Sequence, residues 1–169
     1  MNAARSIDAV LAEATRFAGV QEQPPGSNRG VEVDYFVREA GLDPKGGFPW
    51  CACFVGQIGR QALGALWPCP RTASVAALAA WAKSAGTGVL VEEPARGDLF
   101  VLWFPSLNRF AHVGFVTALT PGGFTTIEGN AAPPGATSSR EGFGVFQRPR
   151  HAGPGTRFIR WVKAMKEEG

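Results

Sequence analysis

The amino-acid sequence predicts an α+β fold in which N-terminal helices pack on a C-terminal antiparallel β-sheet. Apolar residues recur at helical spacing as far as about residue 86, whereas after Gly88 the pattern changes to apolar runs and strict alternation. Helices followed by strands along one chain are typical of this class. Since no repeat or linker divides the 169 residues, we expect one domain over residues 1–169.

Four helices are expected in the N-terminal half. The first follows a cap at Ser6 and ends at Gly19, and the second covers residues 33–40. The third runs over residues 51–63. The fourth begins after a cap at Thr72 or Ser74 and ends near Gly86.

The second half predicts strands. Residues 99–104 form a continuous apolar run, typical of a central strand. Residues 112–119 and 124–128 alternate on either side of a Pro-Gly-Gly turn, which predicts a hairpin. Shorter strands are expected at 145–146 and 158–162, and a loop over 131–142.

The amino-acid composition limits the kinds of protein that this chain can be. The chain is 45% hydrophobic and 18% charged, as in ordinary globular domains. Its net charge of +3 comes without a Lys/Arg-rich run, so we expect no nucleic-acid partner. No apolar run approaches the roughly 18 residues of a membrane span. Asp8 and Glu13 interrupt the first apolar pattern, so we expect synthesis in the cytoplasm without a signal peptide.

Cys51 is the candidate nucleophile. Pro49 favours the first turn of a helix, and Cys51 begins the apolar face that continues through Phe54, Val55 and Ile58. A thiol at that position meets free backbone N–H groups and the positive end of the helix dipole, both of which favour the thiolate. Because cysteine is also a common core residue, a base must be found beside it.

His112 and Glu128 are the candidate base and its orienting partner. Alternation puts His112 at the start of one hairpin strand, and Glu128 and Asn130 on one face near the end of the other. An antiparallel hairpin brings these ends together. A nucleophile, a base and a third polar group that orients the base are what thiol acyl transfer requires. The second histidine, His151, is expected in a solvated loop.

Four motifs occur in a fixed order: Pro49-Trp50-Cys51, Gly97-Asp98-Leu99, His112-Val113-Gly114 and Glu128-Gly129-Asn130. Over about residues 28–130 the chain resembles the CHAP (cysteine, histidine-dependent amidohydrolase/peptidase) family, which is related to NlpC/P60 in the papain-like superfamily.

The resemblance implies a papain-like fold and cleavage of an amide bond in bacterial peptidoglycan, by an N-acetylmuramoyl-L-alanine amidase or an endopeptidase. It implies Cys51 as nucleophile, His112 as general base, Glu128 as orienting residue and Asn130 as a further polar residue of the site. We expect no cofactor and no calcium, because the acidic residues upstream of Cys51 lack the spacing of a metal loop.

Other readings of the same residues remain open. A zinc site of Cys51, Cys53, Cys69 and His112 lacks the spacing of paired ligands. An inactive wall-binding module on the same fold, or a cysteine acyltransferase or deamidase that acts on protein, would use the same positions. The tryptophans are expected mostly in the core, and Trp50, beside the nucleophile, is also a candidate for lining the substrate groove. Tyr35 is a weak candidate for a second oxyanion donor, and a place at the edge of the core is preferred for it.

The sequence fits several biological settings. We expect a monomer that acts on the cell wall after release or delivery, as a phage lysin or a secreted effector. Its partners would then include a pore, a secretion machine or an immunity protein. A domain cut from a larger protein fits the sequence equally well.

Overall fold

The computed structural model describes residues 2–136 and 142–166, and within them it confirms the α+β class. The helices are α1 (Ala3–Arg16), α2 (Val31–Glu39), α3 (Cys51–Leu63) and α4 (Val75–Ser84). The strands are β1 (Leu90–Val91), β2 (Leu99–Phe104), β3 (Arg109–Thr120), β4 (Gly123–Ala131), β5 (Gly144–Arg150) and β6 (Thr156–Ile159). Short 3₁₀ turns occupy Pro44–Gly46, Gly64–Leu66, Pro105–Leu107 and Trp161–Ala164.

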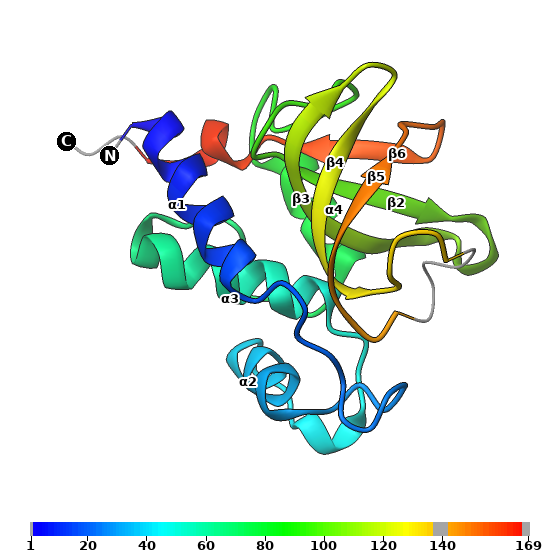
Figure 1. Cartoon of the computed structure of the whole chain (residues 1–169). Helices are drawn as coiled ribbons and strands as arrows, with labels where there is room; N and C mark the ends of the chain where they lie inside the picture. The colour runs from blue at the N-terminus through cyan, green and yellow to red at the C-terminus, as the bar shows by residue number, and fades with distance from the viewer. Residues whose placement is uncertain (1, 137–141, 167–169) are drawn as a thin grey trace.

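The six strands form one antiparallel sheet in the order β1-β6-β2-β3-β4-β5. Figure 1 shows β3, β4 and β5 arching across β2 and β6, with α1 and α3 beside them. Helix α3 packs on β3 and β4, while α1 and α2 pack on α3. The segment after α1 pairs with β5 through Gln21 and Gly144, so this edge of the sheet is partly covered.

Helix boundaries follow the sequence closely. Helix α3 begins at Cys51 and ends at Leu63, as expected, and Ser74 caps α4 by accepting a hydrogen bond from the Ala77 N–H at 3.1 Å. The cap expected at Ser6 is wrong. Helix α1 starts a turn earlier, where the Asn2 side chain accepts from the Arg5 N–H, and Ser6 is buried.

Four strands differ from their expected lengths and one was not expected. Strands β3 and β4 extend beyond the expected 112–119 and 124–128 at both ends. Strand β5 continues to Arg150 although it contains Pro149, because an edge strand tolerates proline. Strand β6 stops at Ile159, and the chain turns into a 3₁₀ helix that buries Trp161. The two-residue strand β1 is too short to show alternation. The loop expected over 131–142 falls partly outside the described residues.

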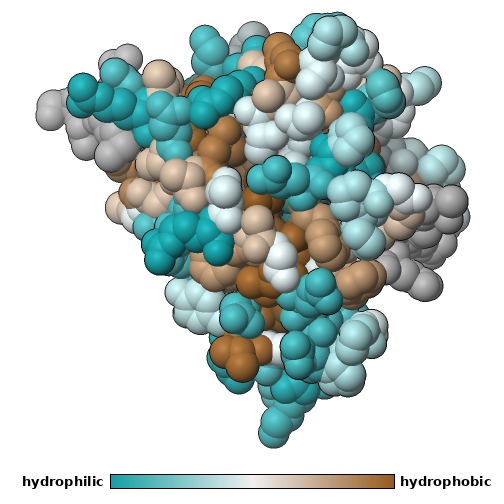
Figure 2. Space-filling view, viewed as in Figure 1, coloured by the Kyte–Doolittle hydropathy of each residue, from teal (hydrophilic) through white to brown (hydrophobic). Residues whose placement is uncertain are grey.

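Apolar side chains gather on both faces of the curved sheet. The larger cluster lies between the helices and the sheet, and a smaller one of Phe100, Val116, Phe124 and Phe158 lies on the opposite face. Figure 2 shows apolar residues reaching the surface mainly in a band through the middle of this face, with hydrophilic residues on both sides. No helix among residues 2–136 and 142–166 is long and apolar enough to cross a membrane.

Gly129 lets α3 approach the sheet closely near its N-terminus. A Cβ atom at residue 129 would lie 2.6 Å from Cβ of Phe54 and 2.8 Å from the Trp50 ring, distances that no real side chain tolerates. The missing side chain therefore brings the start of α3 against the end of β4. This contact sets the position of Cys51 relative to the sheet.

Candidate active site

Cys51 is the first residue of α3, and only 3% of its surface is exposed. Its Sγ lies 4.0 Å from the carbonyl oxygen of Ala111, on the strand that also carries His112. The first N–H groups of a helix have no partner within the helix, so the backbone around Sγ offers donors. The expected placement of the thiol at the start of a helix is confirmed.

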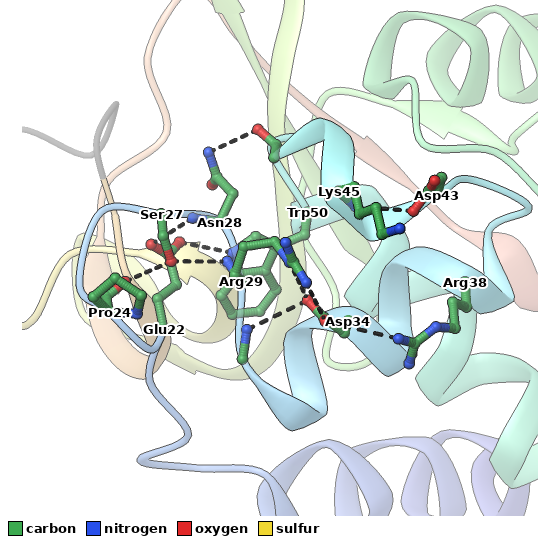
Figure 3. A network of polar contacts seen from close by, with 12 residues as sticks. Glu22, Pro24, Ser27, Asn28, Arg29, Asp34, Arg38, Asp43, Lys45 and Trp50 are labelled. Atoms are coloured by element: carbon green, nitrogen blue, oxygen red, sulfur yellow. Dashed lines mark hydrogen bonds and ion pairs between the residues drawn. The ribbon is translucent and has the colours of Figure 1, made fainter.

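Hydrogen bonds hold the side chain of Trp50, the residue directly before Cys51, in place. Its indole Nε1 donates to Oε1 of Glu22 at 2.9 Å, and the Asn28 backbone N–H donates to Oε2 at 3.0 Å (Figure 3). The Asn28 side chain in turn donates to the carbonyl of Gly47 at 3.1 Å. Trp50 is fully buried, so the expectation that it lines a substrate groove is wrong. It fixes the chain as it enters α3.

His112 and Glu128 meet as the hairpin predicts. Nε2 of His112 lies 2.7 Å from Oε2 of Glu128, and both side chains are almost completely buried. An ionised carboxylate only accepts hydrogen bonds, so Nε2 carries the proton and Nδ1 is left for the thiol. Burial disfavours the charged imidazole, but hydrogen bonds to Cys51 and Glu128, and their charges, raise the pKa of His112 to about 9.

Arg150 on β5 is a member of this cluster that the sequence reasoning missed. Its Nε and Nη2 donate to Oε1 and Oε2 of Glu128 at 2.5 and 2.6 Å, and Thr126 donates to Oε1 at 2.5 Å. Burial alone would raise the pKa of Glu128, but the hydrogen bonds from Arg150 and His112 lower it to about 2. The signal that could have found Arg150 is the alternation of Arg148 and Arg150, which the intervening proline obscured.

Cys51, His112 and Asn130 line one open cleft of about 610 Å³. Asn130 has a positive φ of 52°, and the pairing of β4 with β5 shifts register between Glu128 and Ala131. Simple alternation, which put Asn130 on the face of Glu128, therefore fails at the end of the strand. Asn130 faces the cleft, whereas Glu128 lies buried behind His112.

The cleft wall is otherwise mostly apolar, with three hydroxyl or charged groups. The described lining residues comprise Leu42, Phe48, Pro49, Thr72, Ala73, Ser74, Val75, Phe104, Leu107, Arg109, Phe110 and Ala111. Among them Arg109 alone carries a permanent charge. Such a cleft suits an extended chain with small or apolar groups and an acidic group within reach of Arg109.

Several other candidates lie away from the thiol. The Tyr35 hydroxyl accepts from the Gln57 side chain at 2.7 Å and does not line the cleft. His151 is exposed, and its Nδ1 lies 2.8 Å from the carbonyl oxygen of Gly122. Cys53 is fully buried, and burial and the neighbouring Cys51 raise its pKa to about 12. Burial also raises the pKa of Cys69. Neither thiol is poised as a nucleophile.

No group of three or more His, Cys, Asp or Glu side chains that could hold a metal ion occurs in the part of the chain that the structure describes. The four residues of the zinc alternative are therefore not gathered into a ligand set.

A buried thiol at a helix N-terminus, an imidazole that faces it and a carboxylate that holds the imidazole define a cysteine-nucleophile site. The chain belongs to the CHAP family, because the family model described as CHAP domain matches residues 43–130, more than half of the chain. CHAP domains are typically cysteine- and histidine-dependent amidohydrolases related to peptidoglycan. No curated protein and no solved structure compared with the chain matches it.

Proposed function

We propose that this protein hydrolyses an amide bond in or at the stem peptide of peptidoglycan through a thiolate nucleophile and an acyl-enzyme intermediate. The observation that carries the proposal is the placement of Cys51 in the cleft beside an imidazole whose far nitrogen is already bound to Glu128. The family assignment supports the substrate class.

The first half of the reaction forms the acyl-enzyme. His112 takes the thiol proton as Sγ of Cys51 attacks the carbonyl carbon, and the carbonyl oxygen becomes an oxyanion. The backbone N–H of Cys51 at the start of α3 stabilises that oxygen. As the C–N bond breaks, the imidazolium of His112 gives its Nδ1 proton to the leaving amine.

The second half releases the product. The neutral imidazole takes a proton from water, the hydroxide attacks the thioester carbonyl, and the C–S bond breaks to return the thiolate and its imidazolium partner. Glu128 remains a carboxylate throughout, because its pKa of about 2 lies far below any working pH. Asn130 contributes a neutral amide to the wall along which the substrate lies.

The test is the release of fragments from purified peptidoglycan, identified by mass spectrometry. We expect fragments from the wild type and none from Cys51→Ala. Cys53→Ala is the matched control, because it removes a buried thiol two residues further along the same helix and should leave the fragments unchanged. The new termini of the fragments identify the bond as an amidase or an endopeptidase target.

Equal and negligible release from wild type and Cys51→Ala, across several wall chemotypes, would overturn the proposal. The same fold would then be better explained as a wall-binding module or as an acyltransferase or deamidase that acts on protein. A thiol-reactive probe separates these outcomes. Alkylation of Cys51 that depends on His112 indicates an active site, whereas alkylation that is independent of His112 indicates an inactive module. Release or delivery of the protein to the wall by partner proteins is part of this proposal.

A further inference from the structure

Arg150 is far from Cys51, His112 and Glu128 along the chain, yet it contacts this cluster directly. Its guanidinium donates a hydrogen bond to each carboxylate oxygen of Glu128 and also lies over the Phe100 ring, 5.0 Å from the ring centroid. The same ring lies 5.9 Å from the His112 ring. One aromatic side chain therefore supports both groups that hold Glu128.

We propose that Arg150 is a positioning residue of this site: it fixes the Glu128 carboxylate in the orientation that receives His112, and thereby directs the other imidazole nitrogen at Cys51. Arg150 does not line the cleft, so it acts through Glu128 and not on the substrate. The role rests on the proposed function for its effect on catalysis, but the arrangement of charges can be tested without any substrate.

The need for a cation follows from the burial of the carboxylate. Glu128 has no exposed surface, and a buried carboxylate needs charged or hydrogen-bonding partners to stay ionised. The groups that face it are His112 on β3, Thr126 on its own strand, and Arg148 and Arg150 on β5, while Cys51 on α3 acts on the far side of His112.

Of these groups, only Arg150 is both permanently charged and directly hydrogen-bonded to the carboxylate. Arg148 influences Glu128 at longer range and donates instead to the carbonyl of Ala132 at 2.8 Å. Arg150 also lies outside residues 43–130, which the CHAP model matches. The family motifs alone would therefore leave the orienting carboxylate without its cation.

Geometry matters as well as charge. The two parallel hydrogen bonds from Nε and Nη2 fix the plane of the carboxylate, which a single ammonium group cannot do. Arg150→Lys should therefore keep Glu128 ionised but let it rotate. Arg150→Met should remove both the charge and the fork while keeping most of the apolar stem that packs on Phe100.

The experiment uses histidine NMR and activity together. The chain has two histidines, so the Cε1–H signals of His112 and the exposed His151 can be followed from pH 2.5 to 10. In the wild type, we expect no inflection of the His112 signal between about pH 3 and 7. In Arg150→Met, the pKa of Glu128 should rise by about one to three pH units, which produces an inflection between about pH 3 and 5. Arg148→Met is the control and should show none.

Activity adds the second readout. In Arg150→Met, the acid limb of the pH profile of kcat/KM on peptidoglycan should shift to higher pH, in parallel with the NMR inflection. Arg150→Lys should keep the wild-type acid limb but lose between about tenfold and hundredfold in kcat, with little change in KM. It also carries the test if Arg150→Met does not fold.

Each result decides one part of the proposal. A folded Arg150→Met without the inflection would refute the electrostatic part, and an Arg150→Lys with wild-type kcat would refute the orienting part. For Arg150→Met, a loss of activity that is uniform at every pH, with no shift of the acid limb, would mean that Arg150 is merely structural. A wild type that does not hydrolyse peptidoglycan would refute the proposed function alone, because the NMR titration would still test the contact.

Discussion

Gly114→Ala should displace the Glu128 side chain while the protein stays folded, so it tests how far catalysis depends on the position of Glu128. Residue 114 lies in β3, on the face of the sheet that carries Glu128. A Cβ there would lie 2.8 Å from Cγ of Glu128, 2.8 Å from Cε1 of Phe100 and 3.0 Å from the backbone oxygen of Ile127. Ordinary carbon contacts begin near 3.5 Å, so Glu128 must move by at least about 0.7 Å. Because the backbone oxygen of Ile127 cannot move, the side chains of Glu128 and Phe100 must move to make room.

The expected magnitudes differ for stability and for activity. Overpacking costs about 1–3 kcal/mol, and replacing glycine by alanine at an ordinary φ returns about 0.4–1 kcal/mol. The free energy of unfolding should therefore fall by about 0–2.5 kcal/mol, which leaves a typical domain folded. A displacement of this size in a catalytic cluster costs on the order of a hundredfold in kcat/KM.

The assay pairs urea unfolding with the initial rate of fragment release from peptidoglycan. Gly153→Ala is the matched control, because a Cβ at residue 153 meets nothing within 4 Å. It should leave kcat/KM unchanged and raise the free energy of unfolding by about 0.4–1 kcal/mol. If Gly114→Ala keeps kcat/KM within about threefold of the wild type while its stability falls as expected, the position of Glu128 does not limit catalysis. The reasoning about the orienting carboxylate would then be refuted.

Three further predictions concern the surroundings of the site. The pKa of Glu128 is lowered from 4.5 to about 2, so its contribution to stability is complete above pH 4.5 and is lost as the pH falls through 2. The pKa of His112 is raised from 6.5 to about 9, so its contribution is complete below pH 6.5 and is lost as the pH rises through 9. Urea unfolding should therefore show greatest stability between pH 4.5 and 6.5, and a profile flat from pH 2 to 9 would contradict these assignments. Trp50→Phe leaves a buried carboxylate without its indole donor and should lower the free energy of unfolding by about 1–3 kcal/mol, whereas unchanged urea denaturation would show that the hydrogen bond contributes nothing. Wild-type enzyme should prefer a peptide with a free carboxylate near the scissile bond over its carboxamide by about fivefold, and Arg109→Gln should lose that preference; an unaltered ratio of kcat/KM would exclude Arg109 from substrate recognition.

The sequence predicted the parts of this site that depend on local pattern. Helical spacing placed Cys51 at the start of α3, and alternation through a short turn brought His112 and Glu128 together. Both inferences need only the geometry of one element or of two elements joined by a tight turn. Such signals are strong in a single sequence.

The parts that were missed depend on contacts between distant segments. Arg150 reaches Glu128 from the neighbouring strand, across 22 residues of chain, and its strand was masked by a proline that an edge position tolerates. The core position expected for Trp50 is confirmed, but its additional place in the groove is not, because nothing in its own neighbourhood reveals Glu22, 28 residues earlier. Asn130 departs from alternation because its positive φ ends the regular strand. Tertiary pairing, which no local period encodes, decided all three.

The position of Arg150 on β5 also has a consequence for the newborn chain. A ribosome synthesises Cys51, His112 and Glu128 before Arg150, because the chain grows from its N-terminus and Arg150 lies on β5. Until β5 emerges and pairs with β4, the guanidinium of Arg150 cannot reach the Glu128 carboxylate. If Arg150 positions Glu128 as proposed, the cluster of Cys51, His112 and Glu128 is complete only when β5 has joined the sheet.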